Sequence, residues 1–346
     1  MKVSIIGGGG LVGSMTAYAL QCGGVVNDIC LIDANQDVAQ GQAIDLLNGA
    51  CLVGDQRIYA GTMEDVSTSN VVVITAGLRR KPDESRLDLI NRNTDLFLNI
   101  LGQAKSAGWK ENGYLVVVSN PVDVLTYLSI HRSGLPWQRV IGLGTQLDTA
   151  RFRGYIAKRL RVPATQVNAL MLAEHGDSMV PVWSSATING LPLRQWPGMN
   201  STVESELFEE TKKAGATIIK LKGGSGFAVG LSIREVVHSI LLDSRRVLPV
   251  SSLQMGCYGV SDVAYSVPTV VGCGGVRQQL EIPLSPKEQM GMQQSARVLR
   301  DTIDQVESRV GAERAPFPNS VLTKASGSSS DNGGRVIPRS AWQGVK

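Results

Sequence analysis

The sequence predicts an α/β protein in two parts, an N-terminal doubly wound parallel sheet followed by a C-terminal α+β region. Two observations carry this prediction. Over roughly the first 145 residues, short β-branched runs alternate with segments of helical period, as in parallel strands joined by crossover helices. In the second half, strands and helices follow one another without strict alternation, which is typical of an α+β arrangement.

The strands expected in the first part are short, apolar and bounded by turn residues. They are Val3–Ile6, Ile29–Asp33, Val71–Thr75, Leu115–Ser119 and Val140–Gly142. Between two of them, a helix is expected over Leu87–Ala107, because Leu87, Ile90, Leu96 and Ile100 recur at helical spacing.

The second part has longer periodic segments. Helices are expected at Thr149–Leu160, Glu204–Lys222, Val229–Asp243 and Pro286–Val310, with strands at Val167–Ala173 and Val180–Ser184. From Gly311 onward the chain is rich in Pro, Ser, Gly and Asn and poor in apolar residues, which predicts disorder. The expected divisions are a first domain over 1–145, a second, α+β domain over 146–310, and a disordered tail over 311–346.

Composition limits the function classes. The 346 residues are 43% hydrophobic and carry a formal net charge of +4 without a clustered basic face, so no nucleic-acid partner is expected. No apolar run approaches the roughly 20 residues that cross a bilayer, and no signal-peptide pattern is evident, so we expect a cytoplasmic protein without a membrane partner. Five scattered cysteines and three separated histidines predict neither a disulfide framework nor a metal site.

A glycine motif follows the first expected strand. Gly8, Gly10 and Gly13, with Leu11 and Val12 between the last two, match G-x-G-x-x-G and open a helix. The glycines permit a tight turn, backbone approach to a pyrophosphate and close helix packing.

Asp33 ends the next strand about 20 residues further on, where a carboxylate accepts from ribose hydroxyls and repels a 2′-phosphate. Together the motif and Asp33 predict a Rossmann domain that binds NAD rather than NADP. The competing interpretation is an ordinary glycine turn and a strand-end aspartate.

Four later segments carry family-specific patterns. They are TAGLRRKPDESRLDL at Thr75–Leu89, VSNPVDVLT at Val118–Thr126, GTQLDTARFR at Gly144–Arg153 and AEHGDSMVPVWS at Ala173–Ser184. In this order behind a dinucleotide motif, the chain resembles the L-lactate/L-malate dehydrogenase family from Lys2 to about Arg309. The resemblance implies hydride transfer between NAD and a small 2-hydroxy acid.

His175 is the candidate proton carrier, because oxidising an alcohol requires removal of its hydroxyl proton and histidine exchanges protons near neutral pH. The resemblance implies that Asp148 orients this histidine, Arg151 binds the substrate carboxylate and Arg86 polarises the substrate carbonyl. The structural alternatives are a histidine in a turn, an aspartate that caps the helix expected from Thr149, and solvated arginines.

The resemblance implies further contacts with the substrate and the cofactor. Asn120 would contact both, although an Asn-Pro turn also explains it. Ser225 lies where lactate enzymes usually have threonine, which agrees with a malate enzyme. The remaining cofactor contacts are expected at Thr75, Ala76, Gly77, Asn93 and Val118.

Substrate choice is expected to depend on Arg80, in the segment Gly77–Arg86, which resembles the family's mobile loop. Lactate enzymes have glutamine at this position and malate enzymes have arginine, since the second carboxylate of oxaloacetate needs a cation in a closed site. Arg80 therefore predicts malate. L-lactate or a broad range of 2-hydroxy acids is the alternative if Arg79 takes the inward position.

Two further expectations concern the whole protein. A catalytically silent NAD-binding regulator on the same fold is a competing interpretation, against which the intact set of candidate residues speaks. The family assembles through C2 interfaces, and we expect a homo-oligomer, a tetramer rather than a dimer.

Overall fold

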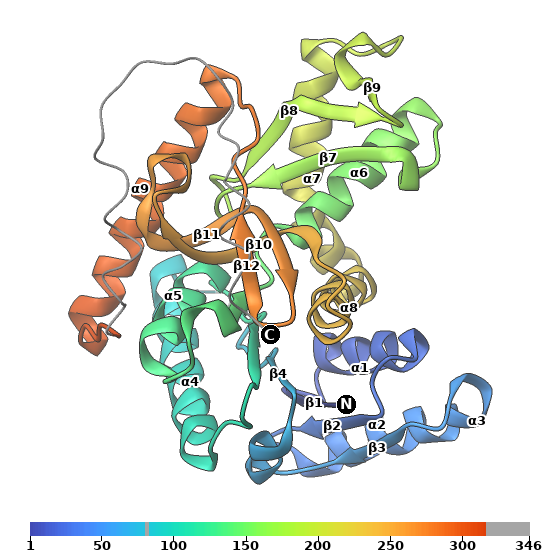
Figure 1. The fold of residues 1–346 in the computed structure, drawn as a ribbon, viewed down its shortest axis with the longest axis vertical. Helices are drawn as coiled ribbons and strands as arrows, with labels where there is room; N and C mark the ends of the chain where they lie inside the picture. The colour runs from blue at the N-terminus through green and yellow to red at the C-terminus, as the bar shows by residue number, and fades with distance from the viewer. Residues whose placement is uncertain (80–82, 316–346) are drawn as a thin grey trace, which may run out of the picture. The chain divides into compact units, whose positions relative to one another are not determined.

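The computed structural model describes residues 1–79 and 83–315, apart from the side chain of residue 86. Met1–Ala315 form one compact unit. Its main element is a nine-stranded sheet in the order β12-β11-β10-β6-β5-β4-β1-β2-β3, as Figure 1 shows in part. The expected fold, a Rossmann-type parallel sheet followed by a C-terminal α+β region, is confirmed.

The parallel half of the sheet contains the strands that the sequence predicts. Its members are β1 (Lys2–Ile6), β2 (Asp28–Ile32), β3 (Arg57–Ala60), β4 (Val71–Ile74), β5 (Tyr114–Val117) and β6 (Val140–Gly142). Only β3 is absent from the sequence prediction, because its four residues begin with an arginine and lack a long apolar run. All neighbouring pairs among these strands are parallel.

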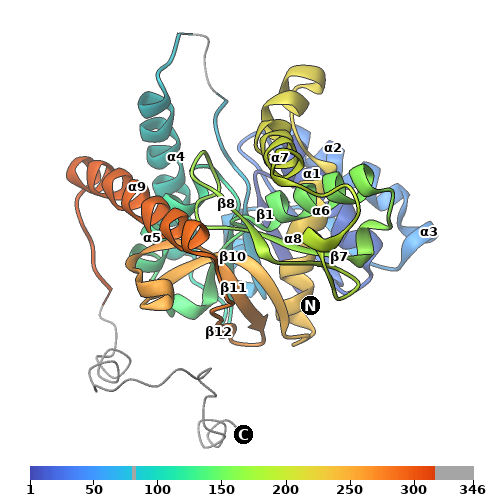
Figure 2. The ribbon, with the colours of Figure 1, turned by 90° about the horizontal axis from the view of Figure 1, so that it is seen from above.

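Helices cover both faces of this half (Figures 1 and 2). They are α1 (Leu11–Gly23), α2 (Gln36–Asn48), α3 (Ala50–Val53), α4 (Arg86–Ala107) and α5 (Val122–Arg132). One face buries Val3 and Ile5 against residues of α1, α2 and α8 (Phe227–Leu241). Helices α4 and α5 lie on the other face. The two-sided cover explains why the strands are apolar throughout rather than alternating.

The second half of the chain extends the same sheet, which the sequence analysis did not anticipate. The added strands are β10 (Arg246–Met255), β11 (Ser261–Gly272) and β12 (Gly275–Gln279), and each is antiparallel to the next. The first of them joins the parallel half by pairing Ser251 with Gly142. Because the sheet crosses the expected boundary at residues 145/146, that domain division stays a proposal.

A smaller sheet completes the C-terminal part. It contains β7 (Val167–Leu172), β8 (Val180–Ile188) and β9 (Leu191–Pro192) in antiparallel order. Residues of this sheet share a core with α6 (Gln146–Leu160) and α7 (Ser201–Lys222), in which Phe152 and Trp183 meet edge to face. This packing places the loop between β7 and β8 beside the main sheet.

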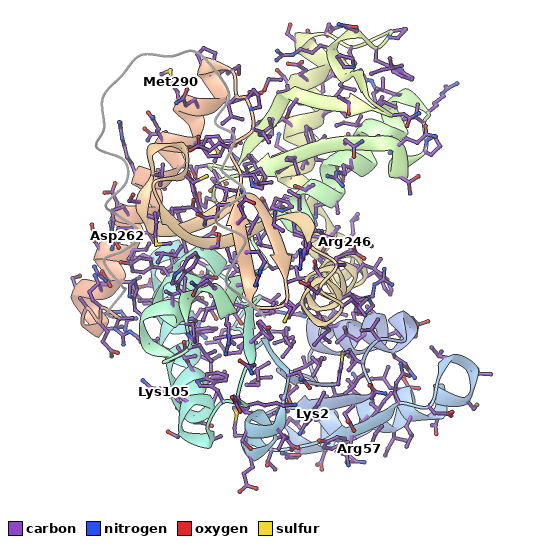
Figure 3. The ribbon with its side chains drawn as sticks, viewed as in Figure 1. Lys2, Arg57, Lys105, Arg246, Asp262 and Met290 are labelled. Carbon is purple, nitrogen blue, oxygen red and sulfur yellow. The ribbon has the colours of Figure 1, made fainter. Side chains whose placement is uncertain are left out.

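The amino ends of the parallel strands are held by ion pairs. Lys2, the first residue of β1, donates to Asp65 at 2.7 Å, and Arg57, the first residue of β3, pairs with Asp28 at 2.8 Å. Figure 3 labels the two basic residues, Lys2 and Arg57. Ligands of open parallel sheets usually bind at the opposite edge, at the carboxyl ends of the strands.

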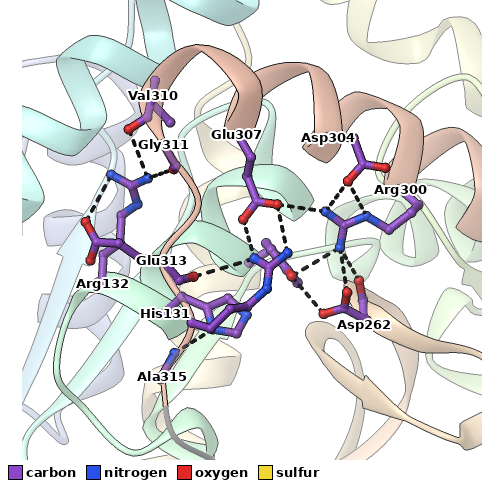
Figure 4. Close-up of polar contacts among 12 residues, drawn as sticks. His131, Arg132, Asp262, Arg300, Asp304, Glu307, Val310, Gly311, Glu313 and Ala315 are labelled. Carbon is purple, nitrogen blue, oxygen red and sulfur yellow. Dashed lines mark hydrogen bonds and ion pairs between the residues drawn. The ribbon is translucent and has the colours of Figure 1, made fainter.

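The described chain ends beyond α9 (Pro286–Val310), where residues 311–315 lie against α5 (Figure 4). Arg132 donates to the carbonyl oxygen of Gly311, Arg314 pairs with Glu307, and the Ala315 amide donates to Nδ1 of His131 at 3.2 Å. These residues therefore differ from the expected disorder, and residues 316–346 lie outside the described part. Within the described residues, no helix is long and apolar enough to cross a membrane.

Candidate active site

The glycine turn between β1 and α1 has no room for side chains. A Cβ at Gly13 would lie 2.2 Å from the carbonyl oxygen of Gly7, and one at Gly8 would lie 2.8 Å from the Cβ of Leu31. Gly10 is the N-cap of α1. Because the glycines carry no side chains, a pyrophosphate could approach the backbone of the turn and the amino end of α1 directly.

A cavity of 1380 Å³ opens at the carboxyl ends of the parallel strands. The predicted residues that line it are Gly10, Leu11, Val12, Gly13, Asp33, Thr75, Ala76, Gly77, Asn93, Val118, Asn120, Arg151, His175 and Ser225. Gly8 is not among the lining residues, since it packs against β2. One cavity thus joins the glycine turn to the candidate proton carrier.

Asp33 and Asn93 hold backbone segments at the cavity wall. Asp33 accepts from the Gly9 amide through Oδ2, at 3.0 Å, which places the carboxylate beside the glycine turn. Asn93 accepts from the Leu78 amide at 2.7 Å and so anchors the start of the loop after β4. The residues present fit a dinucleotide, with a glycine turn for the phosphates and a carboxylate for the ribose.

His175 lies in the loop between β7 and β8 and meets Asp148 of α6. Its Nδ1 contacts Oδ2 of Asp148, while Oδ1 of the same carboxylate accepts from Nη1 of Arg151 at 3.1 Å. Asp148 is 1% exposed. The helix begins at Gln146 with Thr145 as its N-cap, so the alternative that Asp148 caps the helix is wrong.

The charges of His175 and Asp148 stabilise each other. Burial alone would lower the pKa of His175, but the nearby Asp148 carboxylate raises it above the ordinary value. Burial would likewise raise the pKa of Asp148, but the positive charge of His175 and the Arg151 guanidinium keep it below its usual range. Asp148 is therefore ionised near neutrality, and the imidazolium form of His175 is favoured.

The His175 side chain keeps 21% of its surface exposed and lines the cavity. With Nδ1 held by Asp148, Nε2 is the nitrogen free to exchange a proton. Arg151 lines the same cavity and, within the described residues, gives one hydrogen bond to Asp148. Its other donors remain for an anionic ligand.

The remaining predicted residues have different outcomes. Asn120 lines the cavity and also accepts from the Val122 amide at 3.3 Å, so its position agrees with the turn interpretation, and its contacts with substrate and cofactor stay a prediction. Arg80 lies outside the described residues. Arg86 begins α4, but its side chain is not described, so its predicted role is untested. Arg79 lines the cavity.

Sequence reasoning missed some of the site. Asp123 of α5 accepts from the His175 amide at 2.7 Å through Oδ2. Its place three residues after Asn120, inside a family-specific segment, was an available signal. Gly215 and Ile219 of α7 also line the cavity. They had no such signal, because α7 approaches the cavity only through the packing of the second half.

The chain matches two family profiles that together cover most of it. Residues 1–142 match the "lactate/malate dehydrogenase, NAD binding domain", and residues 145–310 match the "lactate/malate dehydrogenase, alpha/beta C-terminal domain". The cofactor of this chain is NAD, which confirms the prediction made from the glycine turn and Asp33.

Relatives and solved structures agree with the profiles. L-lactate dehydrogenase 1 of Clostridium acetobutylicum is 37% identical over 310 residues, covering 88% of this chain and 98% of its own. L-lactate dehydrogenase of Acetivibrio thermocellus is 40% identical over 307 residues, covering 87% and 96%. The crystal structure of the minor L-lactate dehydrogenase of Enterococcus mundtii with bound ligands has a TM-score of 0.84 at 38% identity, covering 88% and 98%.

These relatives are called L-lactate dehydrogenases, so they favour the alternative substrate over the malate that Arg80 predicts. The profiles, the relatives and the fold agree on the wider assignment: the chain belongs to the lactate/malate dehydrogenase family and is an NAD-dependent 2-hydroxy-acid dehydrogenase.

Proposed function

We propose that the protein oxidises L-lactate to pyruvate and catalyses the reverse reaction. The observation that carries the chemistry is the contact series Arg151–Asp148–His175, in which the arginine and the histidine line one cavity with the glycine turn. The choice of lactate is supported by the names of relatives that match this chain over nearly their whole length.

His175 handles the proton in this proposal. In oxidation, neutral Nε2 accepts the hydroxyl proton of the substrate, and Asp148 stabilises the imidazolium that forms. In reduction, the imidazolium donates the proton to the carbonyl oxygen. Bound NAD supplies the nicotinamide carbon that takes up or returns the hydride.

The other side chains bind and orient the substrate. Arg151 would bind the substrate carboxylate through the donors that it does not give to Asp148, in a planar geometry suited to two hydrogen bonds. Asn120 would support the substrate and the nicotinamide, and Ser225 would form part of the pocket wall. Arg86 would stabilise the charge that develops on the carbonyl oxygen.

L-Malate is the second candidate substrate, and Arg80 is the observation that favours it. A guanidinium in a closed site would pair with the second carboxylate of oxaloacetate and would be left unpaired by pyruvate. Steady-state kcat/KM values for pyruvate and oxaloacetate with NADH decide between the candidates. A higher value for pyruvate is expected, and a higher value for oxaloacetate would replace lactate by malate.

Arg80→Gln should lower the ratio of oxaloacetate to pyruvate kcat/KM by at least roughly tenfold, because the variant removes a cation that only a dicarboxylate can pair with. The ratio is measured for both acids under identical conditions. Arg79→Gln is the matched control in the neighbouring position. If Arg79→Gln changes the ratio and Arg80→Gln does not, Arg79 is the discriminating residue.

Asp33→Asn should reduce the preference for NAD over NADP by roughly tenfold or more. The variant removes the charge that repels a 2′-phosphate, while its amide oxygen can still accept from the Gly9 amide. The measurement compares kcat/KM for NADH and NADPH at constant ionic strength. An unchanged ratio would show that Asp33 does not face the ribose.

Two features of the whole protein remain proposals. We propose a homo-oligomer, a tetramer rather than a dimer, as the family's C2 assembly suggests. Light scattering of the eluted protein measures its mass in solution. A cytoplasmic location is also proposed.

A further inference from the structure

Asp123 is a buried carboxyl group that contacts the backbone of the candidate proton carrier. It is the second residue of α5 and is only 2% exposed. Its Oδ2 accepts from the backbone amide of His175 at 2.7 Å. Because His175 lies in a loop between β7 and β8, this bond ties the loop to α5, while the ring of His175 contacts Asp148 of α6.

The groups that face Asp123 and His175 come from several elements. Ser251 of β10 and Glu174 of the His175 loop lie near the Asp123 carboxyl. Asp148 and Arg151 of α6 act on the charge of the His175 ring. Two buried carboxyl groups therefore contact His175, Asp148 at a ring nitrogen and Asp123 at the backbone amide.

We propose that Asp123 is a positioning residue: its carboxylate holds the His175 backbone and adds a second negative charge near His175, which sets the pH range where this histidine carries a proton. The inference rests on the proposed role of His175 and names a further group that controls it. Asp123 touches neither the substrate nor the nicotinamide in this proposal.

The electrostatic effect has a definite sign. Burial raises the pKa of Asp123 to about 7, although Ser251 and His175 oppose that rise. The ionised form is helped by its place in the first turn of α5, where the helix dipole favours a negative charge. Ionised Asp123 raises the pKa of His175, together with Asp148 and against the effect of burial. Protonated His175, which reduction needs, then persists to higher pH.

Asp123→Asn separates charge from geometry. The amide oxygen can still accept from the His175 amide, but the negative charge is gone. In full-length protein labelled with ¹³C at histidine Cε1, NMR titration without cofactor should show the pKa of His175 lowered by roughly 0.5–1 unit. The His175→Asn spectrum identifies the signal among the three histidines.

The pH dependence of kcat/KM should shift in the same direction as the His175 titration measured by NMR. In the pyruvate direction, kcat/KM requires protonated His175 and falls as pH rises, so Asp123→Asn should move this fall to lower pH by the same amount. In the lactate direction, the gain of activity with rising pH should also begin at lower pH. A purely structural role would lower kcat equally at every pH.

Two further variants provide a second test of the inference and a matched control. Ser251→Ala removes a hydroxyl that lowers the pKa of Asp123, so it should shift the His175 titration in the same direction as Asp123→Asn, by less. Asp37→Asn is the matched control, because Asp37 holds the same second position in α2 but is exposed. It should shift nothing.

The outcomes separate the inference from the proposed function. An unchanged His175 titration in both Asp123→Asn and Ser251→Ala would overturn the inference, whatever the turnover. If Asp123→Asn does not fold, the Ser251→Ala titration decides. Absence of turnover with every 2-oxo acid would instead refute the proposed function and leave the NMR result standing.

Discussion

His175→Asn should lower kcat/KM for pyruvate reduction by roughly a thousandfold, because asparagine cannot carry a proton to the substrate. The substitution is small in structural terms. The asparagine amide can donate to Asp148, which also keeps its bond from Arg151 at 3.1 Å, so no buried charge is left without a partner. The measurement is steady-state NADH oxidation with saturating pyruvate and again at low pyruvate.

NADH binding is the control for this variant. The glycine turn and Asp33 line the part of the cavity that His175 does not form, so NADH affinity, measured by fluorescence, should stay within about twofold of wild type. Wild-type turnover in His175→Asn would refute the proton-transfer role. Loss of both turnover and NADH binding would point to a folding defect, which the thermal midpoint detects.

Glu288→Ala should destabilise the fold by about 3–4 kcal/mol, because one carboxylate satisfies several donors. Glu288 lies in the first turn of α9 and is 6% exposed. It accepts from the amides of Trp183, Ser184 and Ser285 at 2.7, 3.0 and 2.7 Å. Truncation leaves these amides, two of them on β8, without the acceptor. Urea unfolding followed by circular dichroism measures the loss.

The pH dependence of this loss has a predictable direction. Burial would raise the pKa of Glu288, but hydrogen bonds from Ser184 and Ser285 keep it below its ordinary value. A carboxyl group with a lowered folded-state pKa stabilises the protein above its unfolded-state pKa, and this contribution is lost as pH falls through the folded-state value. The difference in unfolding free energy between wild type and Glu288→Ala should therefore become smaller below about pH 4.5.

Matched variants separate two contributions of the Glu288 carboxylate, its bonds to β8 and its part in the cap at the start of α9. Glu288→Gln keeps an acceptor oxygen and should lose about half as much stability. Ser285→Ala removes only the cap and should lose about 1 kcal/mol. Equal stability of Glu288→Ala and wild type would show that the link between α9 and β8 does not contribute to folding.

The sequence predicted the parallel strands and the long helices well, because each carries its own local signal. α9 begins and ends where its periodicity predicts, with Ser285 as cap and Gly311 after its end. Strand β3 was missed because four residues with a charged start carry little pattern. Strands β10–β12 were not predicted at all, and their place in the main sheet could not be predicted either, since partner choice between distant strands has no local signal.

The site residues also divide into those that sequence spacing could assign and those whose contacts depend on the tertiary structure. Gly13 and Asp33 could be assigned from spacing, because a turn and the next strand end in one βαβ unit are close whatever the rest of the chain does. His175 and Asp148 come from separate elements, and only the family resemblance joined them before the structure did. Their contact depends on how the β7–β8 loop lies beside α6.

The sequence by itself determined that this protein binds a dinucleotide and that a histidine is available for proton chemistry, because both depend on residue types in short segments. Only the tertiary structure decided what surrounds that histidine. It brings Asp148 from α6 to the ring and Asp123 from α5 to the backbone, with both carboxyl groups buried. The physical reason is that charges interact strongly only when packing brings them close and excludes water, and spacing along the chain does not encode that packing.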